Sequence, residues 1–402
     1  MRKIDLTSFQ IATSETARDI NRRIVLDLVR TRQPISRADL ARCSGLQRST
    51  ISLITEQLIE EQWVTEGAMG HAPRGRKPRF LHLNDERARI IGINVRPAVT
   101  TIALADLSGR FVAQESIGTA ADSKTFVADL SDRVRDFIRL HPQVFYEGIG
   151  VSLPGRVDYA SQRLVFAPNL GWRDVDLKTP LELTTGLLVE IENAANACAL
   201  SEMWFGRHTE GLHDFISLTV SEGIGTGIVT NGQLVRGPTG MAGEFGHVLI
   251  NEEGPLCRCG NRGCWEAYAS NTAAVNYYAQ ATNGTRKNSA NRDIPVPTFD
   301  DLLRLAAQRD SKAVEALDRM AHYLGVGIAM LVTGFAPSVI IIVGEVTRAW
   351  ERIGPIIKRV VEERSPMPSM TRIIPADDTA HPRLRGTIAL ILQKHFAAPT
   401  TA

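Results

Sequence analysis

The chain has 402 residues, of which 44% are hydrophobic and 22% are charged, so it can form two or three domains with sizeable cores. Five cysteines, an odd number, argue against a disulfide framework and indicate a reducing cytoplasm. The opening MRKIDLTSFQ has no apolar stretch behind its basic pair, so we expect no signal peptide.

Charge is distributed unevenly along the chain. The net charge is +2 overall, but residues 1–89 carry 16 Lys and Arg against 11 Asp and Glu, a net charge of +5. The remainder therefore carries −3. This distribution favours an anionic partner for the N-terminal part. Ordinary variation of surface charge is the alternative, and charge alone does not exclude it.

The N-terminal part shows the period of helices. Apolar residues recur at helical spacing in Ala17–Arg32. Ser36 can cap a short helix that contains Leu40, and Gly45 permits a tight turn after it. A longer helix is predicted to begin near Leu46, and its apolar face consists of Ile51, Ile54, Leu58 and Ile59.

Two short helices joined by a glycine-containing turn are typical of a helix-turn-helix. The second helix of that unit enters the major groove, and its first residues meet base edges. We therefore predict DNA contacts from Gln47, Arg48, Ser49, Thr50 and Ser52. A purely structural three-helix bundle with a polar outer face is the alternative.

A wing is predicted to follow the helices. Trp63–Thr65 and Arg79–Leu83 can pair as two strands around the basic tip PRGRKP. Arg74, Arg76 and Lys77 in this tip are predicted to contact DNA, either its phosphates or a narrow A·T-rich minor groove. A solvated linker is the alternative.

From Arg89 onward the pattern changes to alternating strands and helices. Two or three strands are expected first, with a turn at Ser108 and Gly109, and then a helix over Phe126–Arg139. The most apolar run, Leu324–Gly344, is interrupted by Pro337 and Ser338. It predicts a buried helix, a turn and a buried parallel strand, with no membrane insertion. The whole is an α/β body with a mixed sheet in each lobe.

Several motifs of this body resemble motifs of the ROK family (bacterial repressors, open-reading-frame proteins and sugar kinases), and they occur in the same order along the chain. They are GVSLPGRVD, PNLGW, ENAANACALSEMWFG, GIGTGIVTNGQLVRGPTGMAGEFGHVLI, CRCGNRGCWEAYAS and GVGIAMLVTGFAPSVIIIVG. The resemblance covers essentially Arg89 to the C-terminus and implies an actin/hexokinase-like two-lobed fold with a sugar in the cleft. The helix-turn-helix places the chain with the repressor branch.

This resemblance suggests three domains. Residues 1–83 would form the winged helix-turn-helix domain, which we call the head. Residues 84–198 would form a smaller α/β lobe, against which a C-terminal helix at about 380–397 packs. Residues 199–379 would form a larger α/β lobe that carries a metal site.

The metal site is predicted from a cysteine cluster. His247 precedes a C-x-C-x4-C motif made by Cys257, Cys259 and Cys264. One imidazole and three thiolates supply the closed tetrahedral shell of a structural zinc ion, one per chain. Buried free thiols and a redox pair are the alternatives.

Sugar contacts are implied by the resemblance. The family motifs place Glu244, His247 and Glu266 on one side of the cleft, with Asn169 and Asn193 from the other lobe. Carboxylates and amides bind the donor and acceptor hydroxyls of a sugar in pairs. A solvated surface position is the alternative for each carboxylate taken singly.

The motifs that serve catalysis in the family's kinases are changed here. Ala194 stands where those kinases carry the aspartate base that takes the hydroxyl proton. The segment 94–98, Asn-Val-Arg-Pro-Ala, replaces a glycine-rich phosphate loop. Glu222 adds a negative charge near the expected phosphate, and Glu345 replaces a glycine.

The favoured function is thus a sugar-responsive, DNA-binding transcriptional regulator that represses genes of carbohydrate uptake or metabolism. A catalytically inactive sugar-kinase fold would serve as its effector sensor. A sugar kinase with a DNA-binding head and a regulator controlled by a protein partner are the alternatives. The partners expected are double-stranded operator DNA, a sugar or sugar phosphate, and a second copy in a homodimer or homotetramer. Glucose, N-acetylglucosamine, xylose and a sugar 6-phosphate are all compatible with the polar groups retained in the cleft.

Overall fold

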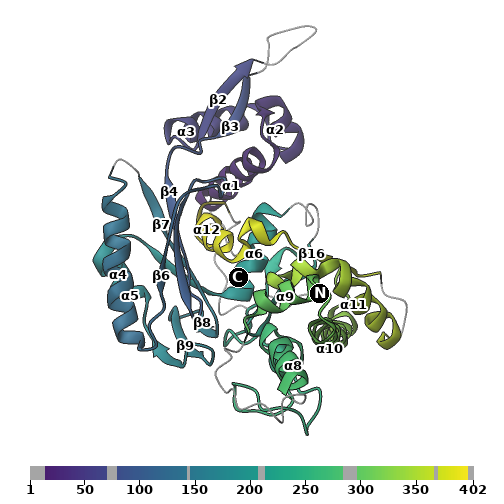
Figure 1. Ribbon diagram of the computed structural model, residues 1–402. Helices are drawn as coiled ribbons and strands as arrows, with labels where there is room; N and C mark the ends of the chain where they lie inside the picture. Colours follow the sequence, from purple (N-terminus) through teal and green to yellow (C-terminus); the bar gives the residue numbers. More distant parts are fainter. Residues whose placement is uncertain are drawn as a thin grey trace.

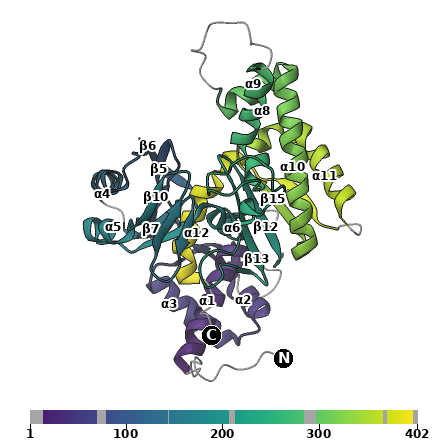
Figure 2. The same ribbon diagram turned by 90° about the horizontal axis from the view of Figure 1, so that it is seen from below.

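The computed structural model describes residues 14–69, 79–142, 145–206, 213–283, 297–365 and 370–396. The predicted wing-tip contacts Arg74, Arg76 and Lys77 lie outside these residues. Figure 1 shows the head above a body of two lobes, and Figure 2 shows the same molecule from below.

The head contains the three predicted helices and the paired wing strands: α1 (Ser14–Arg32), α2 (Arg37–Ser44), α3 (Arg48–Glu60), β1 (Ile35–Ser36), β2 (Val64–Met69) and β3 (Arg79–Leu83). Ser36 caps α2 through a capping box with Asp39, as its position predicted. Gly45 ends α2 at φ 73°. Helix α3 begins later than expected, because Gln47 is extended and serves as its N-cap. The pairing of β1 with β3 was not predicted.

The smaller lobe is built on a five-stranded mixed sheet of order β11-β7-β4-β5-β6. Parallel pairing joins β4 to β7 and β7 to β11, while β5 runs antiparallel to both β4 and β6. The bounds are β4 (Arg89–Asn94), β5 (Val99–Ala105), β6 (Phe111–Gly118), α4 (Ser123–Arg139), β7 (Tyr146–Leu153), α5 (Lys178–Thr185) and β11 (Val189–Asn193). A small antiparallel sheet follows β7, with strands β8 (Arg156–Asp158), β9 (Arg163–Ala167) and β10 (Trp172–Val175).

The larger lobe has a second mixed sheet, of order β14-β13-β12-β15-β16. Its strands are β12 (Phe215–Val220), β13 (Ile224–Thr230), β14 (Gln233–Leu234), β15 (Val339–Val343) and β16 (Arg372–Pro375). Helices of this lobe are α7 (Glu266–Ala269), α8 (Asn271–Asn283), α9 (Phe299–Ala307), α10 (Ser311–Phe335) and α11 (Trp350–Arg364), with 3-10 turns η1 (Phe245–His247), η2 (Glu345–Ala349) and η3 (Asp378–Ala380).

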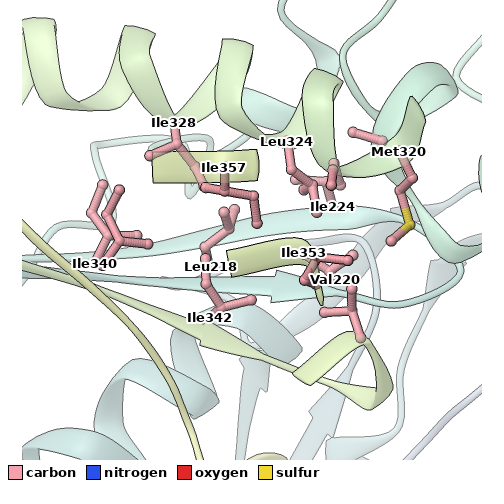
Figure 3. Packing of buried hydrophobic residues seen from close by; sticks show 14 of the residues in the cluster. Leu218, Val220, Ile224, Met320, Leu324, Ile328, Ile340, Ile342, Ile353 and Ile357 are labelled. Carbon is pink, nitrogen blue, oxygen red and sulfur yellow. The ribbon is translucent and has the colours of Figure 1, made fainter. Parts of the chain in front are cut away.

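The core of the larger lobe accounts for the most apolar run of the sequence. Leu324 and Ile328 of α10 pack with Ile353 and Ile357 of α11 onto the sheet, where Leu218 lies in β12 (Figure 3). Strand β15 pairs in parallel with β12 and β16, as predicted for this run. No helix among the described residues is long and apolar enough to cross a membrane.

Two helices lie between the sheets: α6 (Ala194–Phe205) and α12 (Pro382–Phe396). They pack closely on each other, α6 also contacts β12 and β13, and α12 also contacts β4 and β7. Gly386 makes the approach possible, because a Cβ there would lie 1.9 Å from the Ala197 carbonyl oxygen. The lobe boundary that we predicted between residues 198 and 199 falls inside α6. The limits of the three domains remain a prediction.

The head is joined to the body by a shared apolar core. Leu26 and Val29 of α1 belong to the same buried cluster as Ile388 and Ile391 of α12. At the edge of this cluster, the Arg30 guanidinium lies 4.4 Å from the Trp204 ring centroid and donates to the Trp204 carbonyl at 3.0 Å. The C-terminal ends of α6 and α12 therefore form the surface on which α1 rests.

Candidate metal and ligand site between the lobes

Four side chains converge on one point of the larger lobe. The donor atoms of His247, Cys257, Cys259 and Cys264 all lie within 4.8 Å of one another. The Sγ atoms of Cys259 and Cys264 are 3.7 Å apart, and His247 Nδ1 lies 3.7 Å from Cys257 Sγ. Two thiolates on a tetrahedral zinc ion, at about 2.3 Å each, would be separated by roughly 3.8 Å. The cluster therefore has the donors and the spacing to hold one metal ion.

The loop that carries the three thiols is built around two glycines. Gly260, at φ 100°, donates to the Cys257 carbonyl at 3.0 Å and turns the chain back. A Cβ at Gly263 would lie 1.6 Å from the Asn251 carbonyl oxygen. Burial raises the pKa of the Cys257 thiol and brings the pKa of Cys264 to about 11. A bound cation supplies the positive charge that would keep such thiols ionised.

Glu266 begins α7 two residues after Cys264, so the cysteine loop fixes its position. Its side chain is buried, and Oε2 accepts the Ile224 backbone N–H at 2.9 Å. Oε1 lies 3.5 Å from Cys257 Sγ. A side chain at Gly223 would exclude this arrangement, because its Cβ would lie 2.2 Å from Glu266 Oε2.

The second carboxylate of the predicted site is Glu244. Its Oε2 lies 3.7 Å from His247 Nε2, whereas Nδ1 of the same ring faces the cysteines. The imidazole thus has one nitrogen for the metal cluster and one toward Glu244. Burial raises the pKa of the Glu244 carboxyl above its ordinary value. From the other lobe, Asn169 accepts a hydrogen bond from Arg258 of the cysteine loop at 3.0 Å.

Asn193 has a structural task that the sequence did not reveal. Its Oδ1 accepts from the backbone N–H of Ala195 and Asn196, at 2.7 and 3.3 Å, and so caps helix α6. Its Nδ2 donates to the Gly155 carbonyl at 2.7 Å. One N–H of this amide remains for a ligand.

The five residues predicted to bind a sugar line a single cavity of about 480 Å³ between the lobes: Asn169, Asn193, Glu244, His247 and Glu266. Ala194, the residue in place of the kinase base, lines the same cavity. The cavity lies beyond the carboxyl ends of β7, β11 and β12, where α/β sheets bind their ligands. Polar groups from both lobes thus face one volume, which is suited to a small polar molecule.

The changed nucleotide motifs also meet in space. Arg96 forms ion pairs with Glu222 and with Glu345, each at 2.9 Å. Burial alone would raise the pKa of both carboxyls, but Arg96 holds the pKa of each below its ordinary value. The sequence argument placed the charge of Glu222 near the expected phosphate. In the structure this charge is paired with Arg96, which Glu222 shares with Glu345.

The predicted DNA contacts lie at the start of α3. Gln47, Arg48 and Ser49 are exposed, whereas Thr50 and Ser52 are half-buried. On the buried side of the same helix, Ile51, Ile54 and Leu58 join the core of the head, as predicted. The sequence argument did not single out Leu53, which is 67% exposed on α3. The sequence could have indicated this exposure, because Leu53 does not lie on the apolar helix face that holds Ile51 and Ile54.

Comparisons with known proteins agree with this architecture. A family model described as ROK family matches residues 90–394. The chain is 35% identical to the xylose repressor of Bacillus spizizenii over 335 residues. The aligned part covers 83% of this chain and 84% of the repressor.

Solved structures share the fold as well. A ROK family transcriptional regulator, described as a homologue of the Escherichia coli MLC protein, superposes with a TM-score of 0.81 at 27% identity, over 95% of this chain and 98% of that one. A ROK family glucokinase from Streptomyces griseus in complex with glucose and AMPPNP superposes with a TM-score of 0.69 at 30% identity, over 76% of this chain and 100% of that one. The expected actin/hexokinase-like body and helix-turn-helix head are confirmed.

Proposed function

Because the chain belongs to the ROK family, we propose that it is a transcriptional repressor whose kinase-like body senses a sugar or a sugar phosphate. The observation that carries this proposal is the cavity beside the His247 and cysteine cluster, which five polar residues line. The head packs on the same body through a shared apolar core. Its effector would bind between the lobes, and the head would bind double-stranded operator DNA.

The head would read DNA with the first turn of α3. Arg48 is exposed there, and an arginine can bind guanine with two hydrogen bonds. The exposed Leu53 offers an apolar contact for a thymine methyl group. Arg74, Arg76 and Lys77 of the wing tip would add phosphate or minor-groove contacts. A head of this kind reads two half-sites as a symmetric dimer, so we propose at least a homodimer.

The metal that we propose is one structural zinc ion per chain, held by His247, Cys257, Cys259 and Cys264. Three sulfur ligands suit zinc, and four protein ligands leave no open position for catalysis. Bound there, the ion would fix the loop that carries Glu266 and the ring that faces Glu244.

We propose further that the protein binds its sugar without phosphorylating it. Ala194 cannot accept a proton, and a positioned base contributes roughly 10²–10⁴-fold to such a reaction. Arg96 and Pro97 also stand where the phosphate loop of the family's kinases has its two glycines. The likeness to a glucokinase favours kinase activity as the second candidate.

A thermal-shift screen of sugars and sugar phosphates tests the sensor. A ligand of the native state raises the apparent Tm, by an amount set by its concentration relative to Kd. The sugar that raises the Tm should change the affinity of the protein for operator DNA selected from genomic fragments. A Glu244→Gln variant, folded by circular dichroism, should lose both responses. A protein that no sugar or sugar phosphate stabilises would contradict the sensor proposal.

A further inference from the structure

Three charged residues join the two lobes at the bottom of the cleft. Arg96 lies two residues after the end of β4 in the smaller lobe, and Glu222 and Glu345 lie two residues after β12 and β15 in the larger lobe. One guanidinium nitrogen bonds to each carboxylate, at 2.9 Å in both cases. The contact therefore links the central strands of both sheets, over sequence separations of more than a hundred residues.

Contacts within the larger lobe position the Glu345 carboxylate and the backbone of Glu222. Glu345 Oε2 accepts from Asn271 Nδ2 at 3.3 Å, which leaves Oε1 for the arginine. The Glu222 backbone carbonyl accepts from Thr272 Oγ1 at 3.0 Å. Both anchoring residues belong to the first turn of α8. The Glu222 and Glu345 carboxylates lie near enough to repel each other, and Arg96, together with Arg383, supplies the positive charge that makes this arrangement favourable.

The same residues divide the space between the lobes. Arg96 and Glu222 line the 480 Å³ cavity and two others, of about 370 and 290 Å³. The side chain of Arg96 is 33% exposed, and those of Glu222 and Glu345 are 37% and 15% exposed. The ion pairs are thus partly shielded from water and salt, unlike a fully exposed surface pair.

We infer that Arg96, Glu222 and Glu345 form an ion-pair latch that holds the lobes closed without a nucleotide. An opening of the lobes must break both ion pairs and move Arg96 away from two neighbouring carboxylates, on which Arg383 of α12 acts as the other positive charge. The latch biases the equilibrium between open and closed forms toward the closed form. The latch acts in the ligand-free protein. Its effect on sugar affinity rests on the proposed sensor function, because a sugar that prefers the closed form would bind more tightly when the latch favours that form.

Hydrogen–deuterium exchange of the full-length, ligand-free protein tests the latch. In Arg96→Ala, the amides of segments 94–101, 221–225 and 344–349 should exchange about fivefold faster, the order expected for losing partly exposed ion pairs. Glu345→Gln is nearly isosteric, and it should give a smaller acceleration at the same segments. Small-angle scattering should show a larger radius of gyration for Arg96→Ala.

Arg352→Ala is the matched control, because Arg352 pairs with Asp318 through two bonds of 2.7 Å inside the larger lobe. It should leave exchange at the three segments unchanged. Unchanged exchange and unchanged scattering in both Arg96→Ala and Glu345→Gln, with each variant folded by circular dichroism, would overturn the latch. The sensor proposal fails separately, through the absence of any stabilising sugar in the unsubstituted protein.

Discussion

At the scale of single residues, the proposed zinc site would need each of its four donors. Cys264→Ala removes one sulfur from a site whose donor atoms lie within 4.8 Å of one another. We expect zinc content to fall well below one ion per chain and the Tm to fall by several degrees, because metal binding stabilises only the folded loop. Elemental analysis and thermal unfolding measure both effects.

Cys198→Ala is the control for this prediction. Cys198 is also buried, but it belongs to α6 and lies in a hydrophobic cluster that contains none of the four donors. It should keep its full zinc content even if its stability falls somewhat through the small cavity. Equal zinc content in the Cys264 and Cys198 variants would show that the cluster holds no zinc.

Arg48 is the residue expected to contribute most to operator choice. Arg48→Ala should weaken specific binding by about 1–3 kcal/mol, the value of a bidentate base contact, and should relax base preference at one position. Leu53→Ala should reduce preference for thymine at a neighbouring position by a smaller amount. Fluorescence anisotropy with single-base operator variants distinguishes the two effects.

The matched control for Arg48 is Arg359→Ala, which removes a 67% exposed arginine from α11 in the larger lobe. It should leave operator affinity and base preference unchanged. If Arg48→Ala bound every operator variant as tightly as the unsubstituted protein does, α3 would not be the reading helix.

At the scale of elements, α6 and α12 join the cleft to the head. Asn193 caps α6 at the cavity, and Trp204 near its other end contacts Arg30 of α1. Phe396, at the end of α12, makes edge contacts with Trp63 and Trp204, with ring centroids 5.8 and 5.7 Å apart. Both helices therefore have one end at the cavity, which Arg383 at the start of α12 also lines, and one end at the head.

Phe396→Ala should loosen the head without disturbing the cavity. Loss of a buried phenylalanine costs about 3–5 kcal/mol, and here the cost falls on the docking of α1. Amides of α1 should exchange faster while those of β12 and β15 do not, and operator binding should lose its response to sugar. Leu183→Ala, which alters a leucine that is 83% exposed on α5, should change neither exchange nor response.

Much of this element order could be predicted from the sequence, because periodicity, caps and turns act locally. The apolar run 324–344 predicted α10 and β15, and Ser36 and Gly45 predicted the bounds of α2. The ion pairs of Arg96 could not be predicted, since their partners lie at positions 222 and 345 and carry no local signal. The capping by Asn193 was missed for a different reason: its place in a family motif suggested a ligand contact.

At the scale of the whole molecule, phosphoryl transfer would require suitable groups from both lobes at once. Ala194→Asp restores a carboxylate to the cavity, but Arg96, Glu222 and Glu345 remain across the nucleotide side of the cleft. We expect no kinase turnover from this variant in a coupled assay with ATP, magnesium and the stabilising sugar. Ordinary turnover would mean that the ion pairs leave room for a nucleotide. Turnover in the unsubstituted protein, lost in Glu244→Gln, would show an active kinase.

The ion-pair cluster also constrains the order in which substitutions can accumulate over generations. Loss of Arg96 alone would leave Glu222 and Glu345 with Arg383 of α12 as the other positive charge that acts on both, and loss of either acid would leave Arg96 with one ion pair instead of two. The effect of a substitution at one of these three positions therefore depends on the residues at the other two. A change that removes an ion pair costs stability while its partner is present and costs less once that partner has been replaced, so the order of the changes decides how much stability is lost at each step.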